Sequence, residues 1–274
     1  MGRARPFFHA VQRTGGWYLA VAFVLMPAQA DLKVQPTFWI HRSATFRMHL
    51  PTEAAPLLRR SAAPAFDQRA AAAIQHFLAR PTMAHQYSAS RRLEASGCGR
   101  QGWLDVQTEF TASSGLFYQV KAEGGSGYIR SRVLRSLLDE EQDLIARNRS
   151  ATVALSAENY QFTPEGLNDE GLVIVQMQPL RKERPLIAGR MFLTVDGDLV
   201  RVEGWLAKNP SFWVTRVNVV RSYRRINGVL MPVSLDTTAQ LRLFGSSALR
   251  MTYRYARIDE RAVIDEARDE RSPL

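Results

Sequence analysis

The last third of the chain alternates hydrophobic and polar residues with a period of two. In the segment LRMTYRY, residues 249–255, leucine, methionine and two tyrosines alternate with two arginines and a threonine, and residues 239–243 alternate in the same way. Successive side chains of a strand point to opposite faces, so this pattern predicts strands with one buried face and one solvated, arginine-rich face. Asp196-Gly197 and Asn227-Gly228 separate such runs and favour the positive φ angles of tight hairpin turns.

Two earlier stretches repeat hydrophobic residues every three or four positions, which predicts helices with one apolar stripe. The first covers residues 66–80, where Asp67 is placed to cap the start and Pro81 to stop the helix. The second covers residues 128–148. The acidic residues expected on its solvated side are Asp139, Glu140, Glu141 and Asp143.

The remaining segments mostly predict strands. Three strands are expected at residues 83–94, 102–111 and 116–122, joined by glycine- and serine-containing turns. A further strand is expected at residues 38–50, before the first helix. Residues 151–162 are ambiguous and favour a short helix or turn at 155–159.

This element order predicts an α+β fold. We expect a curved antiparallel β-sheet, an unclosed half-barrel, with two or three helices covering its concave apolar face. The expected divisions are a signal peptide at 1–30, an N-terminal strand and loop extension at 31–65, the half-barrel domain at 66–258, and a charged flexible tail at 259–274.

The first 30 residues are typical of a secretory signal. A basic start precedes the ten-residue apolar run WYLAVAFVLM, residues 17–26, and Ala28-Gln29-Ala30 fits a cleavage site. Ten apolar residues are too few to span a bilayer, which needs about 20. We therefore expect a periplasmic protein cleaved after Ala30; an uncleaved anchor is the alternative.

The predicted layout resembles the LolA-type outer-membrane lipoprotein carrier superfamily and related periplasmic lipid-binding proteins. The resemblance rests on the exported start, on the order helix, three strands, helix and meander, and on the run LTVDGDLV at residues 193–200 with later strands ending at Tyr253-Arg254-Tyr255. It implies an unclosed barrel with helices in its concave face. It offers no motif that transfers a functional residue. The segment 38–60 is more similar to the opening of a helix-grip, START-like lipid-binding domain, and both alternatives imply an apolar cavity under a curved sheet.

Charge narrows the classes of partner. The formal net charge is +10, and the charged tail is acidic, so the folded part is more basic still. A basic surface suits anionic lipid headgroups or nucleic acid. Export argues against nucleic acid, and we expect none as a partner. The alternative is that the basic charge reflects no partner at all and that arginine simply occupies the solvated face of each strand.

The chain shows no catalytic motif. Ser126 lies in GGSGY, which lacks the final glycine of a nucleophile elbow, and no histidine follows His85. The histidines have no zinc-ligand spacing, and the single cysteine, Cys98, has no evident base beside it. We therefore expect a protein that is not an enzyme and that carries no metal or cofactor.

The leading hypothesis is a periplasmic carrier or sensor that binds an apolar ligand, a lipid or the acyl chains of lipoproteins, with transient contact to an anionic membrane surface. The alternative is a non-enzymatic structural or interaction module of the cell envelope with a filled core. An aromatic group at residues 205–213 fits either a barrel mouth or packing at a sheet corner. The residues expected to line a cavity are Ile129, Val133, Leu137, Trp205, Phe212, Trp213, Leu241, Leu243, Met251 and Tyr253.

Overall fold

The structure, a computed structural model, describes residues 62–80, 84–183, 186–210, 212, 214–242 and 245–263, with side chains from Phe66 onward. The signal peptide, the strand at 38–50 and the tail after 263 lie outside the described residues, as do Trp213 and Leu243.

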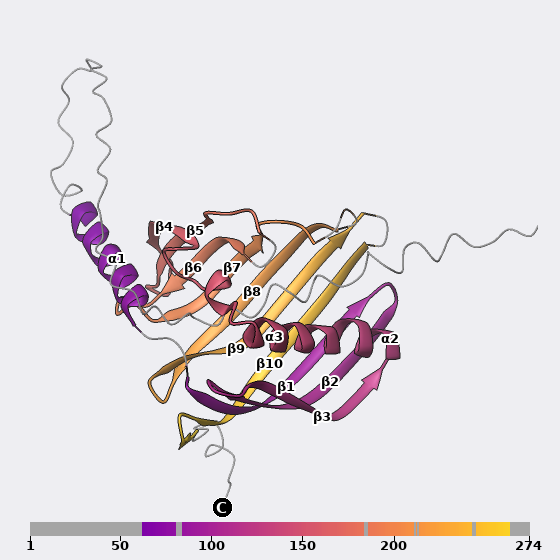
Figure 1. Cartoon of the computed structure of the whole chain (residues 1–274). Helices are drawn as coiled ribbons and strands as arrows, with labels where there is room; N and C mark the ends of the chain where they lie inside the picture. Colours follow the sequence, from indigo (N-terminus) through magenta and orange to yellow (C-terminus); the bar gives the residue numbers. More distant parts are fainter. Residues whose placement is uncertain are drawn as a thin grey trace, which may run out of the picture.

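The described chain folds around one eleven-stranded antiparallel sheet, curved and unclosed (Figure 1). Its strand order is β3-β2-β1-β10-β9-β8-β7-β6-β5-β4, with β11 paired to β10. The early strands β1 to β3 thus join the sheet through β1, which pairs with β10, the last long strand. The strands are β1 Gln86–Gly97, β2 Arg100–Thr111, β3 Gly115–Gly125, β4 Tyr160–Leu167, β5 Val173–Pro179, β6 Ile187–Leu193, β7 Leu199–Leu206, β8 Val214–Ile226, β9 Val229–Leu241, β10 Gly245–Ile258 and β11 Arg261–Ala262.

The predicted alternation is confirmed in the strands that form the middle of the sheet. In β10, Leu249, Met251, Tyr253 and Tyr255 are buried, while the arginines between them are exposed. Both predicted hairpin turns are confirmed as well. Asn227 and Gly228 have φ angles of 52° and 84°, and Gly197 has a φ of 82°.

Two helices pack on the sheet, and both were predicted with different bounds. α1 covers Ala62–Ala79, so Asp67 lies inside the helix and does not cap it. The second helix is continuous but changes its winding: α2 Gly127–Ile129, a π-helical segment η3 Arg130–Arg135, and α3 Ser136–Ala146. A short 3₁₀ helix, η4 Ser150–Val153, follows. At residues 155–159, where a short helix or turn was expected, the chain forms a bend and a turn, and β4 begins at Tyr160.

The two helices attach to different parts of the sheet. The second helix contacts β1, β2 and β3, whereas α1 contacts β4 and β6. The hairpin between β6 and β7 lies against α1: a Cβ on Gly197 would stand 2.6 Å from the carbonyl oxygen of Ala73. Only glycine therefore allows this close approach and the positive φ at once.

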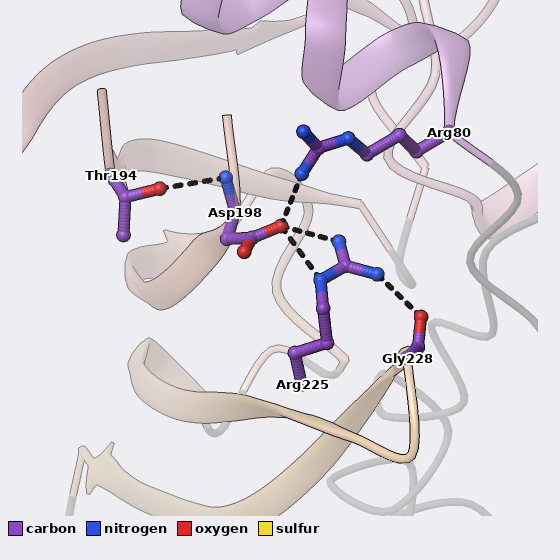
Figure 2. A network of polar contacts seen from close by, with 5 residues as sticks. All are labelled: Arg80, Thr194, Asp198, Arg225 and Gly228. Carbon is purple, nitrogen blue, oxygen red and sulfur yellow. Dashed lines mark hydrogen bonds and ion pairs between the residues drawn. The ribbon is translucent and has the colours of Figure 1, made fainter. Parts of the chain in front are cut away.

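A polar network fixes the same end of the sheet (Figure 2). Asp198 Oδ1 accepts hydrogen bonds from Arg80 Nη1 at 2.7 Å, at the end of α1, and from Arg225 Nε at 2.8 Å, in β8. Arg225 Nη1 donates to the carbonyl oxygen of Gly228 at 2.7 Å, and the Asp198 amide donates to Thr194 Oγ1. The hydrogen bond from Arg225, with the charges of both arginines, lowers the pKa of Asp198 despite the opposing effect of burial. One carboxylate thus links α1 to two hairpin turns.

Candidate ligand site beneath the second helix

The centre of the candidate site is a buried ion pair between the sheet and the second helix. Arg91 stands on the buried face of β1, between the apolar residues Ala89 and Leu93. Its Nη1 donates to Glu141 Oε2 at 2.6 Å and its Nη2 to Glu141 Oε1 at 3.2 Å. Glu141 belongs to α3, and the two side chains are only 1% and 9% exposed. The pair therefore joins helix to sheet in the protein interior.

Arg91 makes two further contacts on the sheet. Its Nη2 also donates to the hydroxyl oxygen of Tyr87 at 2.9 Å, and its guanidinium lies 4.8 Å from the centre of the Tyr253 ring. Burial acts to lower the pKa of Arg91, but the charge and hydrogen bond of Glu141, together with Tyr87 and Tyr253, outweigh it and leave the pKa raised. Arg91 is accordingly a permanent cation in an apolar layer.

A second buried arginine lies farther along the sheet. Arg221 of β8 is 4% exposed, and its guanidinium lies 5.3 Å from the centre of the Tyr223 ring. Burial opposes its charge, while the neighbouring tyrosines and Glu141 favour it, so its pKa is also raised. Tyr253 lies within the electrostatic influence of both guanidiniums, which act to lower its pKa against the larger effect of burial. Arg91 and Arg221 thus flank one tyrosine.

Tyrosine rings surround the two arginines. Tyr253 and Tyr255 stack with ring centres 6.1 Å apart, and Tyr87 meets Tyr255 edge-on at 5.7 Å. Burial raises the pKa of Tyr87, Tyr223, Tyr253 and Tyr255, so each phenol remains a neutral hydrogen-bond donor. The Tyr255 hydroxyl donates to the carbonyl oxygen of Pro232 at 2.8 Å. The Tyr223 hydroxyl and Arg91 Nε are two of several buried side-chain atoms that make no hydrogen bond within the described residues.

The buried charged side chains among the described residues are Arg91, Glu141 and Arg221. Removing an ion from water costs several kcal/mol even after relaxation, so each of these charges needs favourable neighbours in the interior. Arg91 and Glu141 pair with each other, and the charge of Arg221 is favoured by the neighbouring tyrosines and by Glu141.

Of the residues predicted to line a cavity, the structure brings together those of the second helix and β10. Ile129, Val133 and Leu137 are buried on the helix, Met251 and Tyr253 are buried on the sheet, and all five belong to one core. Leu241 of β9 is partly buried against the same core. Trp205 and Phe212 are elsewhere, 43% and 70% exposed. Trp213 and Leu243 lie outside the described residues.

Glu141 corrects one prediction. It was expected on the solvated side of the helix with its acidic neighbours, but it is buried, and Glu140 beside it is half-buried. Glu141 is four residues after Leu137 and three after Leu138, so it shares their face. The sequence reasoning also missed Arg91 and Arg221, although a signal existed. In the alternating pattern of its strand, each arginine stands at a position where the neighbours two residues away are buried; for Arg221 these are Val219 and Tyr223.

The opposite face of the sheet carries a hollow of about 750 Å³ over β5 to β8. Gly189 and Gly204 face each other in its floor, where a Cβ on either would stand within 2.2 Å of a carbonyl oxygen of the neighbouring strand. Trp205 and Arg216 form one wall, with the guanidinium 4.6 Å from the ring centre. Trp205 is therefore exposed because it lies in this hollow and not in the core.

Comparison with known proteins adds little about function. No family model matches the chain, and no curated protein matches it. Two solved structures are similar at 9% identity. One is a DUF1329 family protein from Desulfovibrio piger, with a TM-score of 0.33 over 70% of this chain and 90% of that one. The other is a LolA superfamily protein from Nitrosomonas europaea, with a TM-score of 0.32 over 74% and 96%.

A member of the LolA superfamily is thus among the structures that this chain is similar to, as the element order predicted. With TM-scores below 0.5, neither alignment assigns a function or a site to this chain. Within the described residues, no helix combines the length and apolarity needed to cross a membrane.

Proposed function

We propose that this protein is an exported, periplasmic carrier or sensor that binds a lipid or the acyl chains of lipoproteins between the curved sheet and the second helix. One observation supports it most: an ion pair and a second guanidinium lie buried inside a continuous apolar layer. A core that served packing alone would gain nothing from two buried guanidiniums, since replacing buried ion pairs by apolar side chains is often neutral or stabilising.

The construction of the covering helix supports the same proposal. The helix rests on β1 to β3 and is interrupted by the π-helical segment Arg130–Arg135. Such segments are rare and are found frequently at functional sites. Because the sheet is unclosed, a shift of this helix would open the concave face without breaking a strand pair. Each methylene of an acyl chain buried there would contribute about 0.8 kcal/mol.

The non-enzymatic alternative, an envelope interaction module with a filled core, also has an observation in its favour. Leu93, Leu104, Leu134 and Leu138 are fully buried where the helix meets the sheet. The two proposals differ in whether this layer admits a ligand. Uptake measurements separate them directly.

The experiment is titration of the purified mature chain with a fluorescent fatty acid. The carrier or sensor proposal predicts saturable uptake, with emission shifted as expected for an apolar environment, and displacement by unlabelled dodecanoate. Trp205→Ala is the matched control, because Trp205 lies on the opposite face of the sheet and its loss is expected to leave uptake unchanged. No uptake by the folded chain would contradict the proposal and favour the interaction module.

A further inference from the structure

We propose that the hollow over β5 to β8, on the face of the sheet opposite the second helix, binds a neutral saccharide. The inference goes beyond the proposed function, because it concerns a second site on the other side of the sheet. The hollow has a volume of about 750 Å³. Small-molecule sites typically have volumes of about 300–1,000 Å³, so this hollow is large enough for a small ligand.

The floor of the hollow consists largely of backbone. Gly189 of β6 and Gly204 of β7 face each other there, and a Cβ on either would stand within 2.2 Å of a carbonyl oxygen. Ala188, which pairs in register with Trp205, adds only a methyl group. Because the close approach of the two strands excludes larger residues at the glycine positions, the depression is built into the sheet.

One wall of the hollow is an aromatic ring that other side chains hold in place. Trp205 is 43% exposed, and the Arg216 guanidinium lies 4.6 Å from its ring centre. Arg216 Nε in turn donates to Asn218 Oδ1 at 2.8 Å. A sugar ring carries C–H groups on its faces and hydroxyls at its edge. It can therefore pack against the open part of the indole without burying an unpaired polar group.

The opposite side of the hollow supplies groups that both donate and accept hydrogen bonds. Gln176 and Gln178 are exposed and project from the same face of β5, which is separated from β7 by β6. An amide side chain offers a donor and an acceptor, as does each hydroxyl of a sugar. Amides facing an indole across a hollow thus match a ligand with an apolar face and a hydroxyl-bearing edge.

The charges of the hollow favour an uncharged ligand. Two carboxylates and two guanidiniums stand among the described residues that line it: Glu165, Glu203, Arg190 and Arg216. Arg190 Nε lies 2.6 Å from Glu165 Oε2. Glu203 forms an ion pair of the same length with Arg201. Both carboxylates therefore have a cationic partner, and the lining carries no net charge. A polar but uncharged ligand makes its contacts here without displacing an ion pair.

The experiment titrates the purified mature chain with three neutral disaccharides, maltose, cellobiose and diacetylchitobiose, and detects binding by saturation-transfer NMR. We expect saturable binding of at least one of them, with the same affinity at low and at high salt, because no charge pair is formed. Strongly salt-dependent binding would overturn the assignment of a neutral ligand. If the folded chain binds none of the three, the site is overturned. Neither result affects the proposed function, which fatty-acid uptake tests separately.

Variants then place the saccharide. Trp205→Ala is expected to weaken binding roughly tenfold, because the stacking surface is lost. Ala188→Leu, whose side chain would fill the floor, is expected to abolish binding and serves if Trp205→Ala fails to fold. The matched control is Trp103→Ala. Trp103 also has a guanidinium, that of Arg92, 3.9 Å from its ring centre, but it lies on β2, outside the hollow. Equal weakening by Trp103→Ala, or undiminished binding by Trp205→Ala, would overturn the inference.

Discussion

Removing the Glu141 carboxylate should destabilise the fold far more than removing an exposed carboxylate of the same helix. In Glu141→Gln the side chain keeps nearly the same shape but loses its charge. Arg91 loses an ionic partner to which it donates at 2.6 and 3.2 Å, in a layer where the two side chains are 1% and 9% exposed. Of the buried charged side chains in the described part of the chain, only arginines then remain.

The magnitude follows from this geometry. Two unit charges about 4 Å apart interact by about 4 kcal/mol at an effective dielectric constant of about 20. Breaking a buried pair by removing one partner typically costs about 3–5 kcal/mol, and a glutamine oxygen still accepts one hydrogen bond from Arg91. We therefore expect Glu141→Gln to lower the free energy of unfolding by about 3 kcal/mol.

The assay is equilibrium urea unfolding of the mature chain followed by tryptophan fluorescence. The matched control is Asp143→Asn on the same helix, whose ion pair with Arg147 is exposed and expected to contribute only about 0.5 kcal/mol. The double variant Arg91→Met with Glu141→Leu should recover most of the loss, because it replaces both partners of the buried pair by apolar side chains. If Glu141→Gln lowers the free energy of unfolding by no more than Asp143→Asn does, the stabilising role of the buried ion pair is refuted.

Three further predictions concern the ends of the sheet and the acidic face of the helix. Gly197→Ala should lower the free energy of unfolding by about 1–3 kcal/mol, because its Cβ would meet the backbone of α1 and its φ is positive. Thermal unfolding checks this. Gly228→Ala is the comparison, because Gly228 also has a positive φ but a Cβ there would meet no atom within 4 Å. Asp198 has a lowered pKa in the fold, so its stabilising effect is present above its unfolded pKa and is lost as the pH falls through the folded value. Asp198→Asn should therefore lower the melting temperature at pH 7 by an amount equivalent to roughly 0.5–1 kcal/mol. The decrease should be smaller in acid, and a decrease that does not depend on pH would argue against the ionic network. Burial and the charges of Asp139 and Asp143 raise the pKa of Glu140 from 4.5 to about 7, so its ionisation destabilises the fold increasingly between these two values and fully above about pH 7. Glu140→Gln should stabilise the protein at pH 8 by on the order of 1 kcal/mol, given its partial exposure, and leave it unchanged at pH 4, where both states are protonated; a melting curve at each pH decides.

Much of the fold was predictable because its strands are solvated on one face. In β10 the alternation of tyrosine with arginine directly gives the buried and exposed sides, and the Asn227-Gly228 dipeptide marks the next hairpin. The edge strand β4 was missed, since Pro164 and Gly166 break its pattern. An edge position tolerates such residues because fewer ladder hydrogen bonds are required of them.

The candidate site was only half predictable. The apolar stripe of the second helix identified Ile129, Val133 and Leu137 correctly as buried residues. Considered singly in the sequence, Glu141 and Arg91 are each expected at the surface, because a charged side chain is rarely buried without a partner. Their partnership joins positions 50 residues apart, and only the folded sheet shows it. Trp205 was grouped with the cavity residues because an aromatic side chain suggested a cavity, and it lines the hollow on the other face of the sheet.

The most direct test of ligand binding is native mass spectrometry of the mature chain purified from periplasm, with lipid extraction of any adduct. The account predicts a co-purifying lipid or amphiphile that carries an acyl chain. A clean mass for the bare chain, with no uptake of added fluorescent fatty acid, would contradict it.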